Sequence, residues 1–283
     1  MIYLIIVSII WALSFSLIKG VLTSLDPVFV AFARLLISFI IFLPFFRFTE
    51  LNKKYFFHFL LIGAVQYGFM YLAYIYSYQY LKAYEIAILT IFTPLFIVIL
   101  YDLWIKKFIP THWVKALLAI LGAGIIVYSE TIQMGFWIGI ILVQFSNIMF
   151  ALGQIYYKKI IERETTFESK NHYAIIFLGA VLMASIFSYF TTDYKSLVIS
   201  FEQLITLLYL GAIASGIGFY LWNIGVTKVK AGSLAVLNNL KIPLGVLSAI
   251  ILLGESVNLT QFILGSIIIL IALFLKENFT NKI

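Results

Sequence analysis

Long apolar segments alternate with short polar links along the whole chain. Charged clusters and proline or glycine breaks mark their ends, and each segment is close to the ~20 residues that a membrane-crossing helix needs. The pattern predicts helices at about 2–20, 27–46, 55–81, 83–101, 111–129, 135–157, 171–191, 201–227, 231–253 and 259–275. The links are too short for a soluble domain. We therefore expect an all-α integral membrane protein with ten transmembrane helices.

Composition leads to the same class. Hydrophobic residues make up 63% of the 283 positions and charged residues 11%, whereas a soluble domain is about half apolar and about a quarter charged. The chain has too little polar surface to cover a globule in water, so lipid is its expected surrounding. We expect a multi-pass protein of the cell membrane, specifically of a bacterial plasma membrane. The absence of cysteine excludes disulfides, thiolate metal sites and cysteine catalysis.

Basic residues are spread unevenly over the predicted links. If the N-terminus is cytoplasmic, the inner loops and the C-terminal tail hold thirteen of the 19 Lys and Arg residues. The outer links hold three, Lys19, Lys82 and Lys195. This asymmetry is the one that the positive-inside rule describes, so both termini are predicted to be cytoplasmic. It also explains the net charge of +7 without a nucleic-acid partner.

An internal repeat relates the two halves of the chain. Gly63–Leu81 resembles Gly211–Val229 at an offset of 148 residues, and each begins with Gly-Ala. The matched positions are Tyr71 with Phe219 and Tyr74 with Trp222, and in the helices that follow, Pro94 and Pro243 lie 149 residues apart. We divide the chain into a first repeat, 1–130, and a second repeat, 131–283. Because each half has an odd number of helices, five, the second must be inverted relative to the first.

Short motifs resemble a known family. They are Trp11-Ala-Leu-Ser-Phe, Ala33-Arg34-Leu-Leu, Thr93-Pro94-Leu-Phe and the stretch from Ile242-Pro243 to Leu253-Gly254-Glu255. Together they are similar to EamA-type members of the drug/metabolite transporter superfamily. The resemblance implies a ten-helix 5+5 inverted repeat with a central cavity, lined largely by the first, third and fourth helices of each half. It also favours gating or structural roles for Arg34, Pro94, Pro243 and Glu255.

The chain departs from this family pattern at two places. The acidic residue expected about twelve positions after the proline is present as Glu255 in the second half, but Lys106 stands there in the first. Lys241, just before Pro243, is also unusual for the family. Substrate class therefore does not transfer directly from the resemblance.

Four tyrosines of the third predicted helix share one face, since Tyr67, Tyr71, Tyr74 and Tyr78 are spaced by 4, 3 and 4 residues. A buried phenol without a partner costs about 1–3 kcal/mol, so these hydroxyls should face protein or water. One interpretation is a substrate cavity whose opposite wall holds Phe219 and Trp222. The other is packing between helices, with the outermost tyrosines in an aromatic belt.

Lys241 lies near the middle of the ninth predicted helix, three positions after Asn238 and on the same face. A lysine at this depth costs about 2.5–3.5 kcal/mol on insertion scales, so it should face a cavity and find a partner. It could bind an anionic group of the substrate, carry a proton, or cap carbonyls that Pro243 leaves unpaired. We expect Lys241 and Asn238 to contact substrate.

Other polar and aromatic residues extend this candidate cavity. Asn147 shares a face of the sixth predicted helix with Gln144 and Gln154, and such amides either bridge helices or line water. Trp11 and Ser14 share a face of the first helix and could complete the wall.

Enzymatic and ATP-driven functions are disfavoured. The sequence has no HExxH zinc helix and no phosphate-binding Walker loop. None of its three histidines has a plausible metal-ligand partner nearby, so we expect no metal and no cofactor. Inverted repeats are typical of secondary transporters that bind substrate near the bilayer midplane.

We therefore predict a secondary transporter that works by alternating access. Its substrate is expected to be a small organic metabolite with an anionic or zwitterionic head, of the amino acid or carboxylate type. An organic cation such as a quaternary amine is an alternative, since tyrosine and tryptophan faces attract cations. A non-transporting receptor or scaffold is the alternative of another class. The expected partners are the substrate and the lipid bilayer, with no nucleic acid, and the protein is expected as a monomer or homodimer.

Overall fold

The computed structural model describes residues 2–46, 53–106, 108, 110–127, 135–163, 169–228 and 241–275, which contain helices and no strand. In the first half the helices are α1 (Ile2–Leu17), η1 (Ile18–Leu22), α2 (Pro27–Phe42), η2 (Leu43–Phe45), α3 (Lys53–Ile62), η4 (Gly63–Phe69), α4 (Met70–Ser77), α5 (Ala83–Leu89), η5 (Thr90–Phe92), α6 (Thr93–Ile105) and α7 (Pro110–Val127). In the second half they are α8 (Phe136–Arg163), α9 (Ser169–Thr191), α10 (Phe201–Tyr209), η6 (Leu210–Ile217), α11 (Gly218–Thr227), α13 (Lys241–Leu253) and α14 (Leu259–Phe274).

Helix ends coincide with capping residues. Asp26 precedes α2, where its Oδ1 accepts a hydrogen bond from the backbone N–H of Phe29 at 2.7 Å and Pro27 occupies the first turn. Ser200 and Gln203 form a reciprocal capping box at the start of α10. Such caps satisfy backbone donors that have no partner within the helix.

Three apolar segments change helix type part-way. The π-helices η4 and η6 interrupt the segments α3–α4 and α10–α11, and the 3₁₀ turn η5 separates α5 from α6. Pro94 follows η5 in the first turn of α6, where its missing N–H costs no hydrogen bond. The wider π turns rotate the residues that follow relative to a regular helix.

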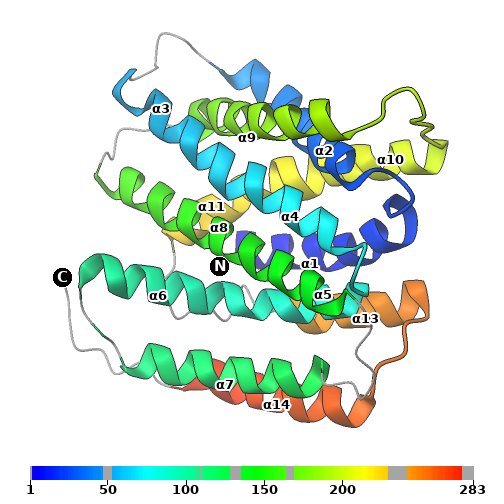
Figure 1. Cartoon of the computed structure of the whole chain (residues 1–283). Coiled ribbons are helices and arrows are strands. Elements are labelled where there is room, and N and C mark those ends of the chain that lie inside the picture. The colour runs from blue at the N-terminus through cyan, green and yellow to red at the C-terminus, as the bar shows by residue number, and fades with distance from the viewer. Residues whose placement is uncertain are drawn as a thin grey trace.

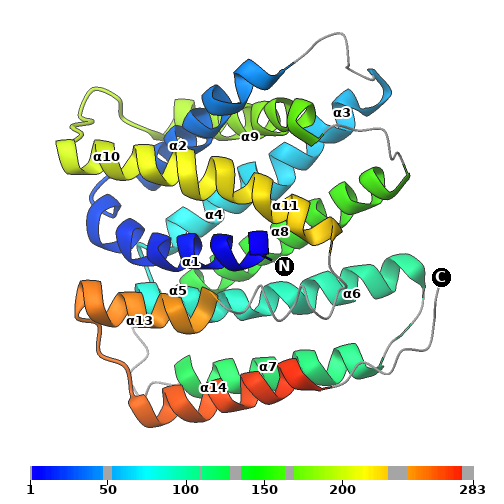
Figure 2. The same ribbon diagram turned by 180° about the vertical axis from the view of Figure 1, so that it is seen from behind.

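The helices pack side by side as a bundle, with parallel and antiparallel neighbours (Figures 1 and 2). At one side of it α7 lies along α14, and at the opposite side α2 packs against α9. Between them, α1 packs against α11 and α13, whereas α8 packs against α4 and α6.

Glycines permit the closest of these contacts. A Cβ added at Gly63 of η4 would collide with the carbonyl oxygen of Ile176 in α9. A Cβ added at Gly211 of η6 would lie 2.7 Å from the Cβ of Ile37 in α2. Close approach of helices through small residues is typical of membrane proteins.

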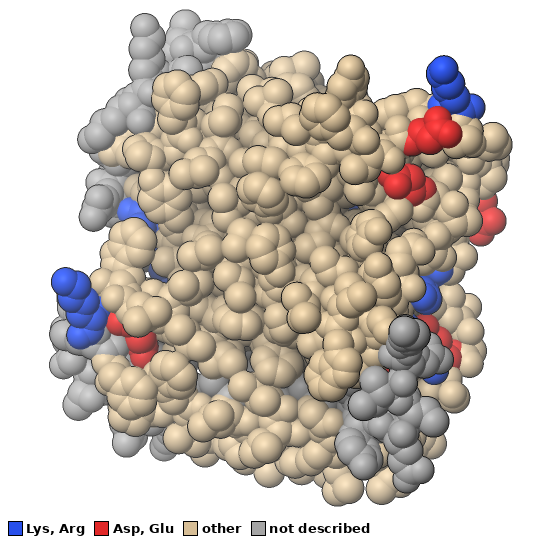
Figure 3. Space-filling model, in the orientation of Figure 1, with Lys and Arg blue, Asp and Glu red and all other residues tan. Residues whose placement is uncertain are grey.

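The surface supports membrane insertion. Among the described residues, seven helices are long and apolar enough to cross a membrane: Ile2–Leu22, Pro27–Phe45, Tyr55–Ser77, Ala83–Trp104, Phe136–Ile161, His172–Thr191 and Phe201–Val226. Figure 3 shows the charged side chains of the visible face at the two edges where helices end, with an uncharged band between them. The band has the distribution expected of a surface that meets lipid.

Several predicted boundaries differ from those of the structure. The helix predicted to end at 157 continues to Arg163, and the one predicted to end at 81 stops at Ser77. Of the helix predicted at 231–253, the structure describes the part from Lys241 onward.

Candidate functional site

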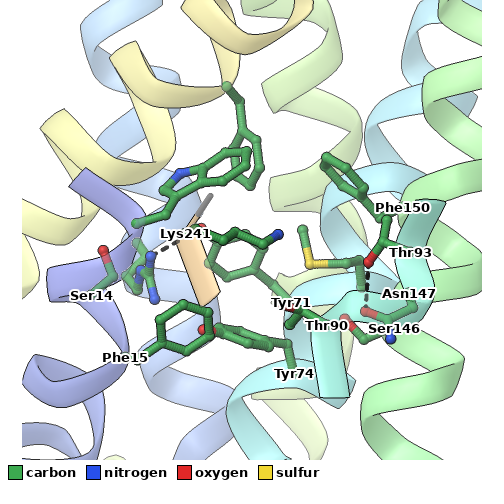
Figure 4. Close-up of a pocket in the computed structure, with 14 residues that line it drawn as sticks. Ser14, Phe15, Tyr71, Tyr74, Thr90, Thr93, Ser146, Asn147, Phe150 and Lys241 are labelled. Carbon is green, nitrogen blue, oxygen red and sulfur yellow. Dashed lines mark hydrogen bonds between the residues drawn. The ribbon is translucent and has the colours of Figure 1, made fainter. Parts of the chain in front are cut away.

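A cavity lies where α1, α2, α4, α8, α11 and α13 meet the broken segment α5–η5–α6. Its empty space, including the part open to solvent, is about 560 Å³. Its described lining consists of Trp11, Ser14, Phe15, Arg34, Met70, Tyr71, Tyr74, Thr90, Thr93, Ser146, Asn147, Phe150, Phe219 and Lys241 (Figure 4).

Arg34 of α2 lines the cavity although only 2% of its surface is exposed. Its Nη2 donates hydrogen bonds to the Tyr71 hydroxyl at 2.9 Å and to the Ser215 hydroxyl at 3.1 Å. Its Nε and Nη1 have no hydrogen-bond partner. Two donor groups of a permanently charged guanidinium are thus buried without a partner beside the cavity.

Lys241 is the second cation of the lining. It is 7% exposed, and its Nζ lies 5.2 Å from the centre of the Trp11 ring, a cation–π distance. The indole is itself fixed, because its Nε1 donates a hydrogen bond to the carbonyl oxygen of Ala214 at 2.9 Å. No acidic side chain is among the described residues that line the cavity. The cavity is therefore electrostatically suited to an anionic group.

Aromatic rings form much of the wall. The Trp11 ring lies 5.1 Å from Phe219 and 6.4 Å from Phe150, measured between ring centres. Tyr71 contacts Phe219 at 5.7 Å. These faces can cover an apolar portion of a ligand.

A neutral polar group lies apart from these rings. In Figure 4, Thr90, Thr93, Ser146 and Asn147 gather on one side of the cavity, away from Ser14 and Phe15. The Asn147 amide donates a hydrogen bond to the carbonyl oxygen of Leu89 at 3.0 Å, and its Oδ1 accepts one from the Thr93 hydroxyl at 3.0 Å. Hydroxyls from the segment around the 3₁₀ turn and from α8, with the Asn147 amide of α8, thus line this side of the cavity.

Seven of the residues predicted to bind substrate line the cavity: Trp11, Ser14, Tyr71, Tyr74, Asn147, Phe219 and Lys241. The three aromatic residues that do not are packed close by. Trp222 is fully buried with its ring 4.8 Å from Trp11. The Tyr67 hydroxyl accepts a hydrogen bond from Asn223 at 3.0 Å, and the Tyr78 hydroxyl bonds that of Tyr74 at 2.7 Å. Asn238 lies outside the described residues.

The residues expected to act in gating or structure lie in different environments. Glu255 accepts hydrogen bonds from the backbone N–H groups of Ala83 at 3.0 Å and Tyr84 at 3.1 Å, so it caps α5 from the other half of the chain. Pro243 is the third residue of α13, two positions after Lys241. Arg34, in contrast, reaches the cavity.

Sequence reasoning missed six residues of the lining, namely Phe15, Met70, Thr90, Thr93, Ser146 and Phe150. Ser146 and Phe150 flank Asn147 on one helical face, so their spacing carried the signal. Thr90 and Thr93 gave none, because the 3₁₀ turn sets their direction. The described residues contain no group of three or more His, Asp, Glu or Cys side chains that could hold a metal.

Comparisons with known proteins agree with this geometry. The model of the EamA-like transporter family matches residues 1–128 and 137–276. The chain belongs to the EamA-like transporter family. It is accordingly a multi-pass membrane transporter of a small molecule and not an enzyme.

Relatives within the EamA-like family resemble the chain over nearly its whole length. Proteins of Salmonella typhimurium and Escherichia coli that are named biotin transporters are each 36% identical over 276 residues, which is 97% of this chain and 92% of theirs. A probable biotin transporter of Pseudomonas aeruginosa is 32% identical over 277 residues, 97% of this chain and 96% of its own. One crystal structure matches 96% of this chain and 93% of its own with a TM-score of 0.68. Its 14% identity makes it similar in fold alone.

Proposed function

We propose that this transporter carries biotin, or a closely similar carboxylate, across a bacterial membrane by alternating access. The observation that carries the proposal is the pair of buried cations, Arg34 and Lys241, in a cavity whose described lining has no acid. The relatives named biotin transporters support it independently.

The chemistry of biotin fits the three parts of the lining. Its carboxylate matches the positive charges of Lys241 and of Arg34, whose Nε and Nη1 have no hydrogen-bond partner. Its valerate chain and thioether ring match the aromatic wall of Trp11 and Phe219. Its cyclic urea, with N–H donors and a carbonyl acceptor, matches the hydroxyls and amide around Asn147.

The other substrate classes fit less well. An organic cation would meet two positive charges in a site of low dielectric, which repel it. An amino acid would bring an ammonium group to a described lining without the carboxylate that usually pairs with one. A carboxylate without an ammonium group is therefore favoured, and Lys241 is proposed to contact it rather than to act only as a helix cap.

We also propose that the fold is a ten-helix 5+5 inverted repeat with halves 1–130 and 131–283. Two separate matches of the family model, to residues 1–128 and 137–276, support the division. The π-helices support it as well: η4 begins at Gly63, and η6 contains Gly211, the residue 148 positions later. Helix contacts recur with the halves exchanged, since α1 packs on α13 and α8 packs on α6.

Both termini are proposed to be cytoplasmic, on the strength of the thirteen-to-three distribution of basic residues. The cavity would then lie near the bilayer midplane at the interface of the halves, where secondary transporters bind substrate.

Uptake by purified protein in liposomes tests the proposed substrate. Vesicles preloaded with unlabelled biotin should accumulate radiolabelled biotin, and protein-free vesicles should not. Biotin methyl ester, which lacks the carboxylate, should compete poorly, whereas desthiobiotin, which keeps both carboxylate and urea, should compete well. Vesicles that exchange no biotin at any internal concentration would contradict the proposal.

A further inference from the structure

On one side of the cavity, three helices bury polar side-chain atoms that have no hydrogen-bond partner. Gln66 of η4 and Gln154 of α8 are 0% and 2% exposed, and neither the oxygen nor the nitrogen of either amide is paired. On α11, the Trp222 indole N–H and the Asn223 amide oxygen are also unpaired, and both residues are 0% exposed.

These residues occupy one level of the bundle. Each lies about one helical turn from a cavity-lining residue: Gln66 before Met70, Gln154 after Phe150, and Asn223 after Phe219. In every helix the step leads toward the same end of the bundle. There α3 begins, α8 continues to Lys158 and Lys159, and α11 ends beside Lys228. We call this end the lysine face.

The helices meet closely at this level. A Cβ added at Gly153, next to Gln154, would lie 2.8 Å from the Cγ of Gln66, so α8 and η4 are in contact here. The Tyr67 hydroxyl accepts a hydrogen bond from Asn223 at 3.0 Å, which joins η4 to α11. At this level η4 therefore contacts both α8 and α11.

Packed aromatic rings separate this region from the cavity. Trp11 lies 4.8 Å from Trp222, and Phe219 lies 4.4 Å from Tyr67, between ring centres. A molecule moving from the cavity toward the lysine face would meet these packed rings.

We propose that Gln66, Gln154 and Asn223 form a second binding station on the substrate route, closed here and occupied when the transporter opens toward the lysine face. Its ligand is a neutral urea or amide group, because glutamine and asparagine amides offer both donors and acceptors and no residue of this cluster is charged. The inference rests on the proposed function in one respect: the urea would be that of biotin.

The opposite side of the cavity differs. One turn away in the other direction, the Tyr74 and Tyr78 hydroxyls bond each other at 2.7 Å, and the Lys19 ammonium donates to the Tyr78 carbonyl at 2.7 Å. Unpaired buried amides destabilise the conformation that buries them. When the transporter opens, water or substrate can supply the missing hydrogen bonds. The unpaired amides therefore favour release toward the lysine face.

Leucine substitutions test the station. Gln66→Leu combined with Gln154→Leu keeps the side-chain volume and removes both amides. Equilibrium binding of radiolabelled biotin to the cavity should change less than threefold, whereas uptake into liposomes should fall at least tenfold. Uptake at the wild-type rate would overturn the proposal, as would a parallel loss of binding and uptake.

Thiol labelling tests the station without relying on biotin. Gln154→Cys in this cysteine-free chain should react with a membrane-impermeant reagent supplied at the lysine face. Ile155→Cys is the matched control, because Ile155 is 7% exposed at the same depth but points in another direction. Equal rates at the two positions would refute the station even if biotin is transported. If position 154 reacts faster but the protein binds no biotin, the proposed opening toward the lysine face stands and biotin is refuted as the substrate.

Discussion

Arg34 and Tyr71 are joined in two ways. The Arg34 Nη2 donates a hydrogen bond to the Tyr71 hydroxyl at 2.9 Å, and the guanidinium carbon lies 4.6 Å from the centre of the Tyr71 ring. Tyr71 and Ser215, whose hydroxyls bond each other at 2.8 Å, thus fix one edge of the guanidinium. The Nε and Nη1 groups have no partner, and the guanidinium is held in place before a ligand binds.

Removing this charge should abolish most carboxylate recognition. Arg34→Gln is expected to weaken biotin binding by 10- to 100-fold, about 1.4–2.8 kcal/mol at 1.4 kcal/mol per decade. Calorimetric titration measures the change. Binding of biotin methyl ester, which carries no carboxylate charge, should change little between the two proteins. An equal loss of affinity for biotin and its methyl ester would show that Arg34 stabilises the structure and does not bind the carboxylate.

Lys241→Met keeps most of the apolar stem and removes the ammonium. Because two cations are proposed to share the carboxylate, biotin affinity should fall by roughly 10-fold or more, about 1.4 kcal/mol. Lys241→Arg should retain part of the binding. The two other roles considered for Lys241 predict different behaviour of these variants. A proton carrier would keep binding and lose the pH dependence of transport, and a helix cap would lose stability but bind normally.

Asn147→Leu should impair recognition of the urea more than of the carboxylate. Biotin affinity is expected to fall about tenfold, roughly 1.4 kcal/mol, since a buried urea would lose its partner. Competition by heptanoate, which has no urea, should be unchanged. Gln144→Leu tests the support of this amide, because Gln144 does not line the cavity but its Oε1 accepts a hydrogen bond from Asn147 at 3.1 Å. If the affinities for biotin and heptanoate fall equally, the Asn147 amide only stabilises the helix break before Pro94.

Glycine substitutions probe helix packing. Gly63→Ala should lower the unfolding midpoint, because the new methyl group meets the Ile176 carbonyl and overpacking costs about 1–3 kcal/mol. Gly124→Ala in α7 meets no atom within 4 Å, so it should be neutral or slightly stabilising. Thermal unfolding in detergent, followed by fluorescence, compares the two. Equal midpoints would contradict the close approach of η4 and α9.

Topology can be tested with single cysteines. Lys106→Cys and Lys228→Cys should react with an impermeant thiol reagent only from the cytoplasm, and Lys195→Cys only from outside. All three lysines are exposed in the structure. Labelling of position 106 or 228 from outside intact cells would contradict the proposed orientation.

Sequence determined the class of the protein and much of its helical content. A charged fraction of 11% cannot cover a globule, and runs of about 20 apolar residues can satisfy their backbone in lipid only as helices or closed barrels. Regular spacing also brought Tyr71 and Tyr74 to one face and identified Lys241 as a candidate, since a lysine inside an apolar helix needs a polar surrounding.

Tertiary structure decided which of these faces meet. Trp222 matches Tyr74 in the repeat, yet it packs behind Trp11 while Tyr74 lines the cavity. Arg34 was predicted from sequence to act in gating or structure, and α2 packs so that Arg34 also lines the cavity. Helical periodicity fixes the angles between residues of one regular helix, but it does not fix the rotation of that helix against its neighbours. The π turns of η4 and η6 and the contacts at Gly63 and Gly211 set that rotation, and they depend on residues distant in sequence.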